Sequence, residues 1–161
     1  MTDHSQYITK KGMDKIQQRI QHLMNNERPD VIRAVAIARE FGDLSENAEY
    51  KSAKERQRAI DHEIDHLRRR SAHLKVVDCD AFPRDIVRFG LFCHTRDLET
   101  NEEQWFHVVG VDEINFPEEE GVMAVSIASP IGKGLLGKKL GEIAIINAPM
   151  GKRQLEIIEI R

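Results

Sequence analysis

Residues 38–50 read AREFGDLSENAEY, and they separate two long stretches in which apolar residues recur at helical spacing. Gly42 is expected to end the first helix, and a second helix begins directly after it. Two helices of comparable length that are joined by a turn of a few residues must lie antiparallel. The segment therefore predicts a helical hairpin, a coiled coil whose tip is residues 42–49.

The first helix of the hairpin has an amphipathic pattern. Its apolar residues recur every three or four positions: Met13, Ile16, Ile20, Leu23, Val31, Ala34 and Ala38. Pro29 removes one backbone donor and disfavours α geometry at Arg28. We therefore expect a kink or a restart of the helix near Glu27.

The second helix alternates steps of three and four residues, which is the heptad spacing of a coiled-coil seam. The seam consists of Tyr50, Ala53, Gln57, Ile60, Ile64, Leu67, Ser71 and Leu74. From Glu46 to Val76 this helix would extend about 45 Å at 1.5 Å per residue. The tip is thus expected to stand far from the rest of the molecule.

From Asp78 onward the pattern changes to short runs rich in β-branched residues, separated by Pro, Gly or acidic segments. The predicted strands are IVRFGLFCHT, QWFHVVGV, MAVSIAS, EIAIINA and QLEIIEI. They favour a compact antiparallel sheet, with a short helix in IGKGLLGKK against one face. The predicted fold class is α+β, with the hairpin over residues 1–77 and a sheet domain over residues 78–161.

The 161 residues are 40% hydrophobic and 32% charged, a balance typical of a soluble protein. No apolar run approaches the roughly 20 residues that span a bilayer, and the first residues lack the apolar middle of a secretory signal. A cytoplasmic location without membrane contact is expected. Cys79 and Cys93 support neither a disulfide framework nor a structural zinc site, and both are expected to be small core or boundary residues.

Charge is distributed unevenly along the chain. Residues 1–77 hold 15 basic and 12 acidic side chains, whereas residues 78–161 hold 9 basic and 15 acidic ones. A basic half beside an acidic half indicates a partner with mixed electrostatics, although surface variation alone also produces such splits.

Asp43 and Glu46 are three residues apart at the tip. This spacing is a capping box, in which each side chain satisfies a backbone donor at the start of the second helix. From spacing alone, capping is the favoured interpretation of the pair.

The same segment matches the signature GDxxENAEY at every fixed position, here over residues 42–50. On this match the chain resembles the GreA and GreB elongation factors, whose hairpin tip carries that signature. The likeness extends through residues 27–30 (ERPD), 109–113 (VGVDE) and 129–131 (SPI). The signature is far more specific than a paired Asp and Glu, and capping and catalysis can coexist at one turn.

The resemblance implies an FKBP-like C-terminal domain that docks at the rim of the secondary channel of bacterial RNA polymerase through Ser129, Pro130 and Ile131. Ala128 stands where relatives usually have Asn or Asp, and Gly132 where they have Ala, which puts the docking geometry in question. The chain is expected to be a monomer. No site for peptidyl-prolyl isomerase activity is found.

The resemblance also implies that the hairpin enters the channel, where Asp43 and Glu46 help to hold a second Mg²⁺ and Glu49 is a further candidate. Backtracked RNA is then cut by water, which leaves a new 3′ end that can be extended. Because Mg²⁺ keeps several waters and takes only one or two carboxylates, the tip alone should bind it weakly. The chain is therefore expected to be no enzyme by itself, and to stimulate cleavage by the polymerase.

A stripe of basic residues follows the second helix away from the tip: Lys51, Lys54 and Arg58. Such a stripe could contact phosphates of the nascent RNA. The alternative is a solvated coiled-coil face paired with Glu55, Asp61 and Asp65. For arginines 68–70 the solvated face is the favoured interpretation.

Two other functions stay open. A Gre-like regulator would occupy the channel and block substrate entry without promoting hydrolysis, although inhibitory relatives carry a more acidic tip than residues 43–46 here. A coiled-coil adaptor unrelated to transcription would tolerate any good turn at the tip. The sequence does not decide between GreA-like release of short RNA fragments and GreB-like release of long ones.

Two further segments resemble known motifs but are not interpreted as functional sites. Residues 62–66, HEIDH, fit the HExxH pattern of zinc proteases, but Ile64 belongs to the seam and places both histidines on the outer face without a cleft. Residues 132–139, GKGLLGKK, imitate a phosphate loop but have Lys139 where Ser or Thr should coordinate Mg²⁺. These glycines are expected to serve turns and close packing.

Overall fold

The computed structural model describes residues 6–43, 46–116 and 119–161. They fall into two compact units, one over Asp14–His73 and the other joining the residues up to Met13 with Leu74–Arg161. The domain bounds 1–77 and 78–161 remain a prediction from the sequence. None of the helices in the described ranges is both long and apolar enough to cross a membrane.

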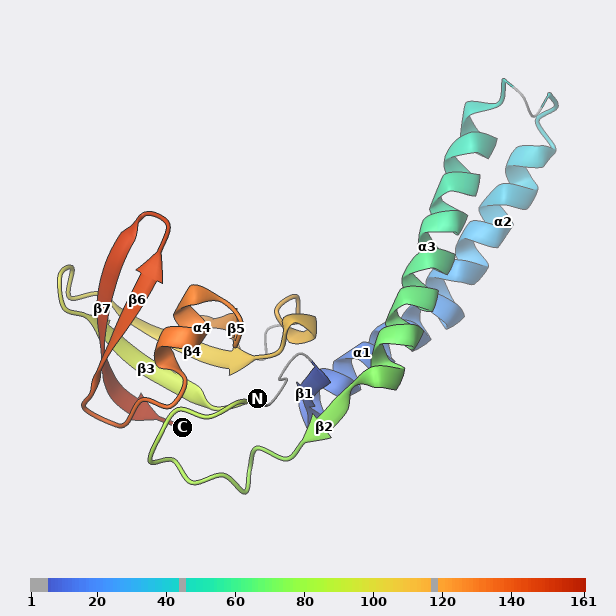
Figure 1. Ribbon diagram of the computed structural model, residues 1–161. Coiled ribbons are helices and arrows are strands. Elements are labelled where there is room, and N and C mark those ends of the chain that lie inside the picture. Colours follow the sequence, from blue (N-terminus) through green and yellow to red (C-terminus); the bar gives the residue numbers. More distant parts are fainter. Residues whose placement is uncertain (1–5, 44–45, 117–118) are drawn as a thin grey trace. The chain divides into compact units, whose positions relative to one another are not determined.

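The hairpin unit is made of helices whose apolar faces pack together (Figure 1). Its helices are α1 (Lys10–His22), which begins before the unit, α2 (Arg28–Arg39) and α3 (Ala48–His73). The core of the hairpin is formed by Leu23, Val31, Ile60 and Ile64, with Leu67 half-buried against them. Every seam position predicted within α3 is buried or half-buried, which confirms the heptad pattern.

The first helix of the hairpin is interrupted by a π-helical segment, Leu23–Glu27, just before Pro29. The Arg28 N–H donates to the Leu23 carbonyl, five residues back. This interruption confirms the prediction of a kink or restart near Glu27. Arg28 itself has φ −64° and ψ −48°, so the expected loss of α geometry at that residue is wrong. The wider π turn accommodates the proline and leaves its predecessor helical.

The second unit is a five-stranded sheet with the order β5-β4-β3-β7-β6. The strands are β3 (Phe92–Asp97), β4 (Glu103–Val109), β5 (Val122–Ser126), β6 (Ile143–Ala148) and β7 (Gly151–Ile160). All neighbours are antiparallel except β4 and β5, which are parallel. The α+β class is confirmed, but the sheet is mixed and the prediction of an antiparallel sheet is wrong. The connection after β4 passes through a short 3₁₀ helix, Val111–Glu113, and is long enough to carry the chain back to the start of a parallel neighbour.

The observed strands differ from the predicted ones in three segments. β1 (Tyr7–Thr9) and β2 (Lys75–Val77) form a parallel pair that was not predicted, because three residues are too few to show a period. The strand expected from Ile86 begins only at Phe92, since residues 89–90 form a turn and Ile86 makes only an isolated bridge to Lys139.

The core of the sheet unit lies between the sheet and α4 (Pro130–Leu135), the short helix that was predicted. Its fully buried large side chains include Leu91, Phe106, Leu135, Ile146, Leu155 and Ile157. Cys93 is buried and Cys79 is half-buried, as expected for core and boundary residues, and both are unpaired by disulfides. Burial raises the pKa of each thiol to about 12, so neither is a thiolate near neutral pH.

Candidate functional site at the hairpin tip

The turn of the hairpin is fixed by backbone hydrogen bonds at the end of α2. The Glu40 N–H donates to the Ile37 carbonyl at 3.1 Å, and the Phe41 N–H donates to the Ala38 carbonyl at 3.2 Å. Gly42 follows with φ +109°, a conformation that side-chain-bearing residues rarely adopt. The glycine therefore ends the helix where the sequence predicted, and Leu44 and Ser45 of the signature lie outside the described residues.

Asn47 closes the turn by bonding to both helices. Its side-chain oxygen accepts from the Tyr50 N–H at 3.0 Å, which makes Asn47 the N-cap of α3. Its side-chain amide donates to the Ala38 carbonyl at 2.7 Å, at the end of α2. The predicted capping box of Asp43 and Glu46 is therefore wrong, because α3 begins at Ala48 and Asn47 supplies the cap.

We expect Asn47→Ala to lower the free energy of unfolding of the hairpin by about 1–2 kcal/mol, since it removes a helix cap and a second hydrogen bond. Asn47→Asp keeps the capping oxygen and loses only the donation to Ala38, so its loss should be smaller. Urea unfolding followed by helical circular dichroism measures both. Equal stability of the Ala variant and the wild type would contradict the bridging role.

The three acidic residues of the tip surround one open hollow. Asp43, Glu46 and Glu49 are all exposed, and they line it together with Phe41, Asn47 and Ala48. Glu49 lies in the first turn of α3, where the helix dipole favours negative charge. Among the described residues, Glu46 and Glu49 make no hydrogen bond or ion pair with another side chain.

The donor set of the hollow suits Mg²⁺, which prefers carboxylate oxygens and water. However, no group of three acidic, histidine or cysteine side chains within the described ranges converges closely enough to hold a metal by itself. The tip can thus supply one or two ligands to a hydrated cation whose other ligands come from elsewhere. Its metal role stays a prediction.

The basic stripe of α3 is exposed at Lys51 and Arg58 and half-buried at Lys54, whose ammonium lies 3.2 Å from the Gln57 side-chain oxygen. Two of its three proposed acidic partners pair with other residues: Asp61 with Arg28 at 2.8 Å, and Asp65 with Arg69 at 3.0 Å. Glu55, the third acidic residue proposed as a partner, is exposed, and RNA contact by the near-tip stripe stays a prediction.

Arginines 68–70 lie on a coiled-coil face whose side chains make contacts within the hairpin, the interpretation that the sequence favoured. Arg69 pairs with Asp65, and Arg68 contacts the Met24 sulfur across the hairpin.

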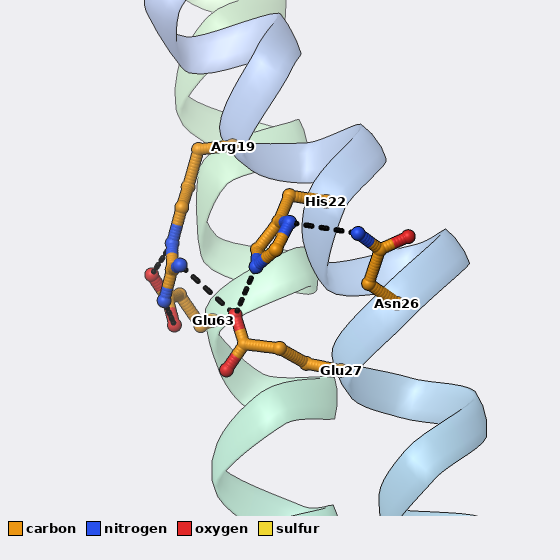
Figure 2. A network of polar contacts seen from close by, with 5 residues as sticks. All are labelled: Arg19, His22, Asn26, Glu27 and Glu63. Carbon is orange, nitrogen blue, oxygen red and sulfur yellow. Dashed lines mark hydrogen bonds and ion pairs between the residues drawn. The ribbon is translucent and has the colours of Figure 1, made fainter.

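The HExxH-like segment has its glutamate held by an arginine. Figure 2 shows Arg19 between Glu63 and Glu27, bonding both oxygens of Glu63 at 3.0 and 3.1 Å and Glu27 at 2.9 Å. His22 joins the same network, 3.5 Å from Glu27 and 3.1 Å from Asn26. Glu63 thus stabilises the hairpin beside the π-helical segment, and it is not placed to act as a base.

The predicted docking residues lie in the sheet unit at the start of α4. Ser129 is the N-cap: its hydroxyl accepts from the Gly132 N–H at 3.1 Å and donates to the Ser126 carbonyl at 2.7 Å. Pro130 is exposed and Ile131 packs half-buried against the core. A side chain at Gly132 would collide with the Ser126 carbonyl, so glycine is needed for this close approach. The turn thus presents Pro130, beside an open hollow that it lines with Ala128, Lys133 and Ile145.

Sequence reasoning missed the role of Glu113, which is buried within the sheet unit. Its carboxylate accepts from the Thr9 N–H and from the Thr9 hydroxyl, both at 2.6 Å. The Thr9 hydroxyl in turn accepts from the Gly12 N–H at 3.0 Å and caps the start of α1. The conspicuous segment VGVDE could have marked this site, but the partners are 104 residues apart in sequence.

Comparison with known proteins identifies the class. The family model "Transcription elongation factor, N-terminal" matches residues 6–76, and the model "Transcription elongation factor, GreA/GreB, C-term" matches residues 83–161. Fold, tip and matches together define a transcription elongation factor. More narrowly, the chain belongs to the GreA/GreB family.

Individual relatives agree over nearly the full length. The chain is 40% identical to the transcription elongation factor GreA of Thermodesulfovibrio yellowstonii, covering 95% of this chain and 94% of that one. It is 38% identical to GreA of Baumannia cicadellinicola subsp. Homalodisca coagulata, covering 95% of each chain. Among solved structures, GreA factor homolog 1 (Gfh1) of Thermus thermophilus aligns over 96% of this chain and 97% of that one, with 22% identity and a TM-score of 0.43.

Proposed function

We propose that this protein inserts its hairpin into the secondary channel of bacterial RNA polymerase and stimulates Mg²⁺-dependent cleavage of backtracked RNA. The observation that carries the proposal is that Asn47 caps the second helix while exposed carboxylates line a hollow at the tip. Asn47 caps α3 and ties it to α2, and the carboxylates of Asp43 and Glu46 are both exposed. Both residues line the hollow, where Glu49 adds a third carboxylate.

In this proposal the chain acts by positioning. Asp43 and Glu46 each offer oxygen ligands, and the apolar core of the hairpin holds together the two helices that flank them. The two carboxylates would hold a second Mg²⁺ jointly with the polymerase, which would complete a two-ion site in which one ion activates water and the other stabilises the leaving oxygen. Lys51, Lys54 and Arg58 would attract the phosphates of the RNA 3′ end. The turn at Ser129–Ile131, which exposes Pro130, would dock the sheet unit at the channel rim.

The proposal is tested with stalled, backtracked elongation complexes in Mg²⁺. Adding the full-length protein should release short 3′ RNA fragments and allow synthesis to resume, while the protein alone should leave free RNA intact. If the RNA in the complexes stays intact and nucleotide addition slows, the protein is a channel-blocking regulator and the cleavage proposal is wrong.

A further inference from the structure

Phe41 is a large aromatic side chain that the turn leaves 70% exposed. Single exposed apolar residues are common in proteins, so exposure by itself carries no meaning. The position of Phe41 is informative because this residue lines the same hollow as Asp43, Glu46 and Glu49. Ile37, one turn earlier on α2, is also exposed, at 57%, but does not line this hollow.

The backbone of Phe41 is held by the bonds that build the tip. Its N–H donates to the Ala38 carbonyl, which also accepts from the Asn47 side chain. Asn47 is bonded in turn to the first turn of α3. Hydrogen bonds through Ala38 and Asn47 therefore connect the backbone of Phe41 with the first turn of α3, which carries Glu49.

An aromatic ring beside carboxylates is suited to a nucleotide. Carboxylates repel a phosphodiester unless a cation lies between the two groups. By themselves, the carboxylates of the tip therefore do not attract RNA. An aromatic face can stack on any of the RNA bases, and this contact needs no metal. A ring at the edge of the hollow could hold the base while the carboxylates face the phosphate.

We propose that Phe41 is a positioning residue whose ring stacks on the base of the 3′-terminal nucleotide of the extruded RNA. The proposal rests on the proposed function, because it takes its ligand from the backtracked complex. It adds a contact that is independent of metal and of base identity. Phe41 would then hold the RNA end in register with Asp43 and Glu46.

The test uses full-length protein with backtracked complexes whose RNA ends in an ordinary base, in an abasic residue or in fluorescent 2-aminopurine. Phe41→Ala should slow cleavage of the base-ended RNA on the order of tenfold, the effect expected for loss of one stacking contact. It should leave cleavage of the abasic RNA unchanged. Wild type should quench 2-aminopurine, Phe41→Ala should not, and Phe41→Tyr should restore both quenching and rate.

Ile37→Ala is the matched control and should behave as wild type with all three RNAs. Equal cleavage by Phe41→Ala and wild type, or an equal loss on abasic RNA, would overturn the stacking proposal and leave the cleavage function standing. Phe41-dependent quenching without any cleavage would support stacking while showing the cleavage function to be wrong. Quenching that Ile37→Ala abolishes as well would also overturn the proposal.

Discussion

Asp43→Asn and Glu46→Gln are each expected to slow RNA cleavage in backtracked complexes about a hundredfold or more. Each substitution keeps the size of the side chain and removes the negative charge, so a weaker ligand faces the cation. The magnitude is that of removing one preorganised electrostatic contact from a reaction centre. The rate of fragment release at saturating protein concentration measures it.

Glu55→Gln is the matched control, because Glu55 is an exposed carboxylate on α3 that does not line the hollow. It should cleave as wild type does. Raising the Mg²⁺ concentration should partly restore the rate of the tip variants if the carboxylates bind the cation. Full activity of both tip variants, with helical content unchanged, would instead favour an adaptor for which any good turn suffices.

The hairpin was predictable because its signals are local and periodic. The spacing of Ile60, Ile64 and Leu67 repeats over many turns, and a glycine marks the end of α2. On α2, however, the pattern predicted Ala34 in the seam and the structure buries Val35 more deeply. Two adjacent apolar residues leave the exact face undetermined, and the π turn before Pro29 shifts it further.

The candidate site residues of the tip were chosen by resemblance, and their spacing alone was misleading. Asp43 and Glu46 have the separation of a capping box, yet the cap is Asn47. A capping argument needs the first residue of the helix, and helix starts are placed from sequence only within a few residues. The signature placed the two carboxylates at the tip, where the structure exposes both, but it did not predict that Asn47 supplies the cap.

Contacts between distant segments could not be predicted from one sequence. β1 and β2 are three residues each, and the parallel pairing of β4 with β5 depends on the path of the chain between them. Glu113 lies in a short 3₁₀ helix, and nothing local indicates that it will bond Thr9. Such interactions become visible only when the fold brings the two segments together.

Glu113→Gln is expected to lower the free energy of unfolding of the sheet unit by about 2–3 kcal/mol. The carboxylate accepts two short hydrogen bonds from Thr9, and bonds to a charged acceptor are stronger than those to an amide. The glutamine cannot accept at both positions, so a buried donor loses its partner. Trp105 in β4 is the single tryptophan, and its fluorescence during urea unfolding reports on this unit.

Thr9→Val separates the two bonds, because it removes the hydroxyl and its cap at Gly12 but keeps the backbone donor to Glu113. Its loss should be about 1–2 kcal/mol, below that of Glu113→Gln. Glu99→Gln, at an exposed turn, should leave the midpoint unchanged. If Glu113→Gln unfolds at the wild-type midpoint, the cost of burying the carboxylate offsets its hydrogen bonds. The structural role of the VGVDE segment would then lie in the close approach of Gly110 to the Tyr7 carbonyl.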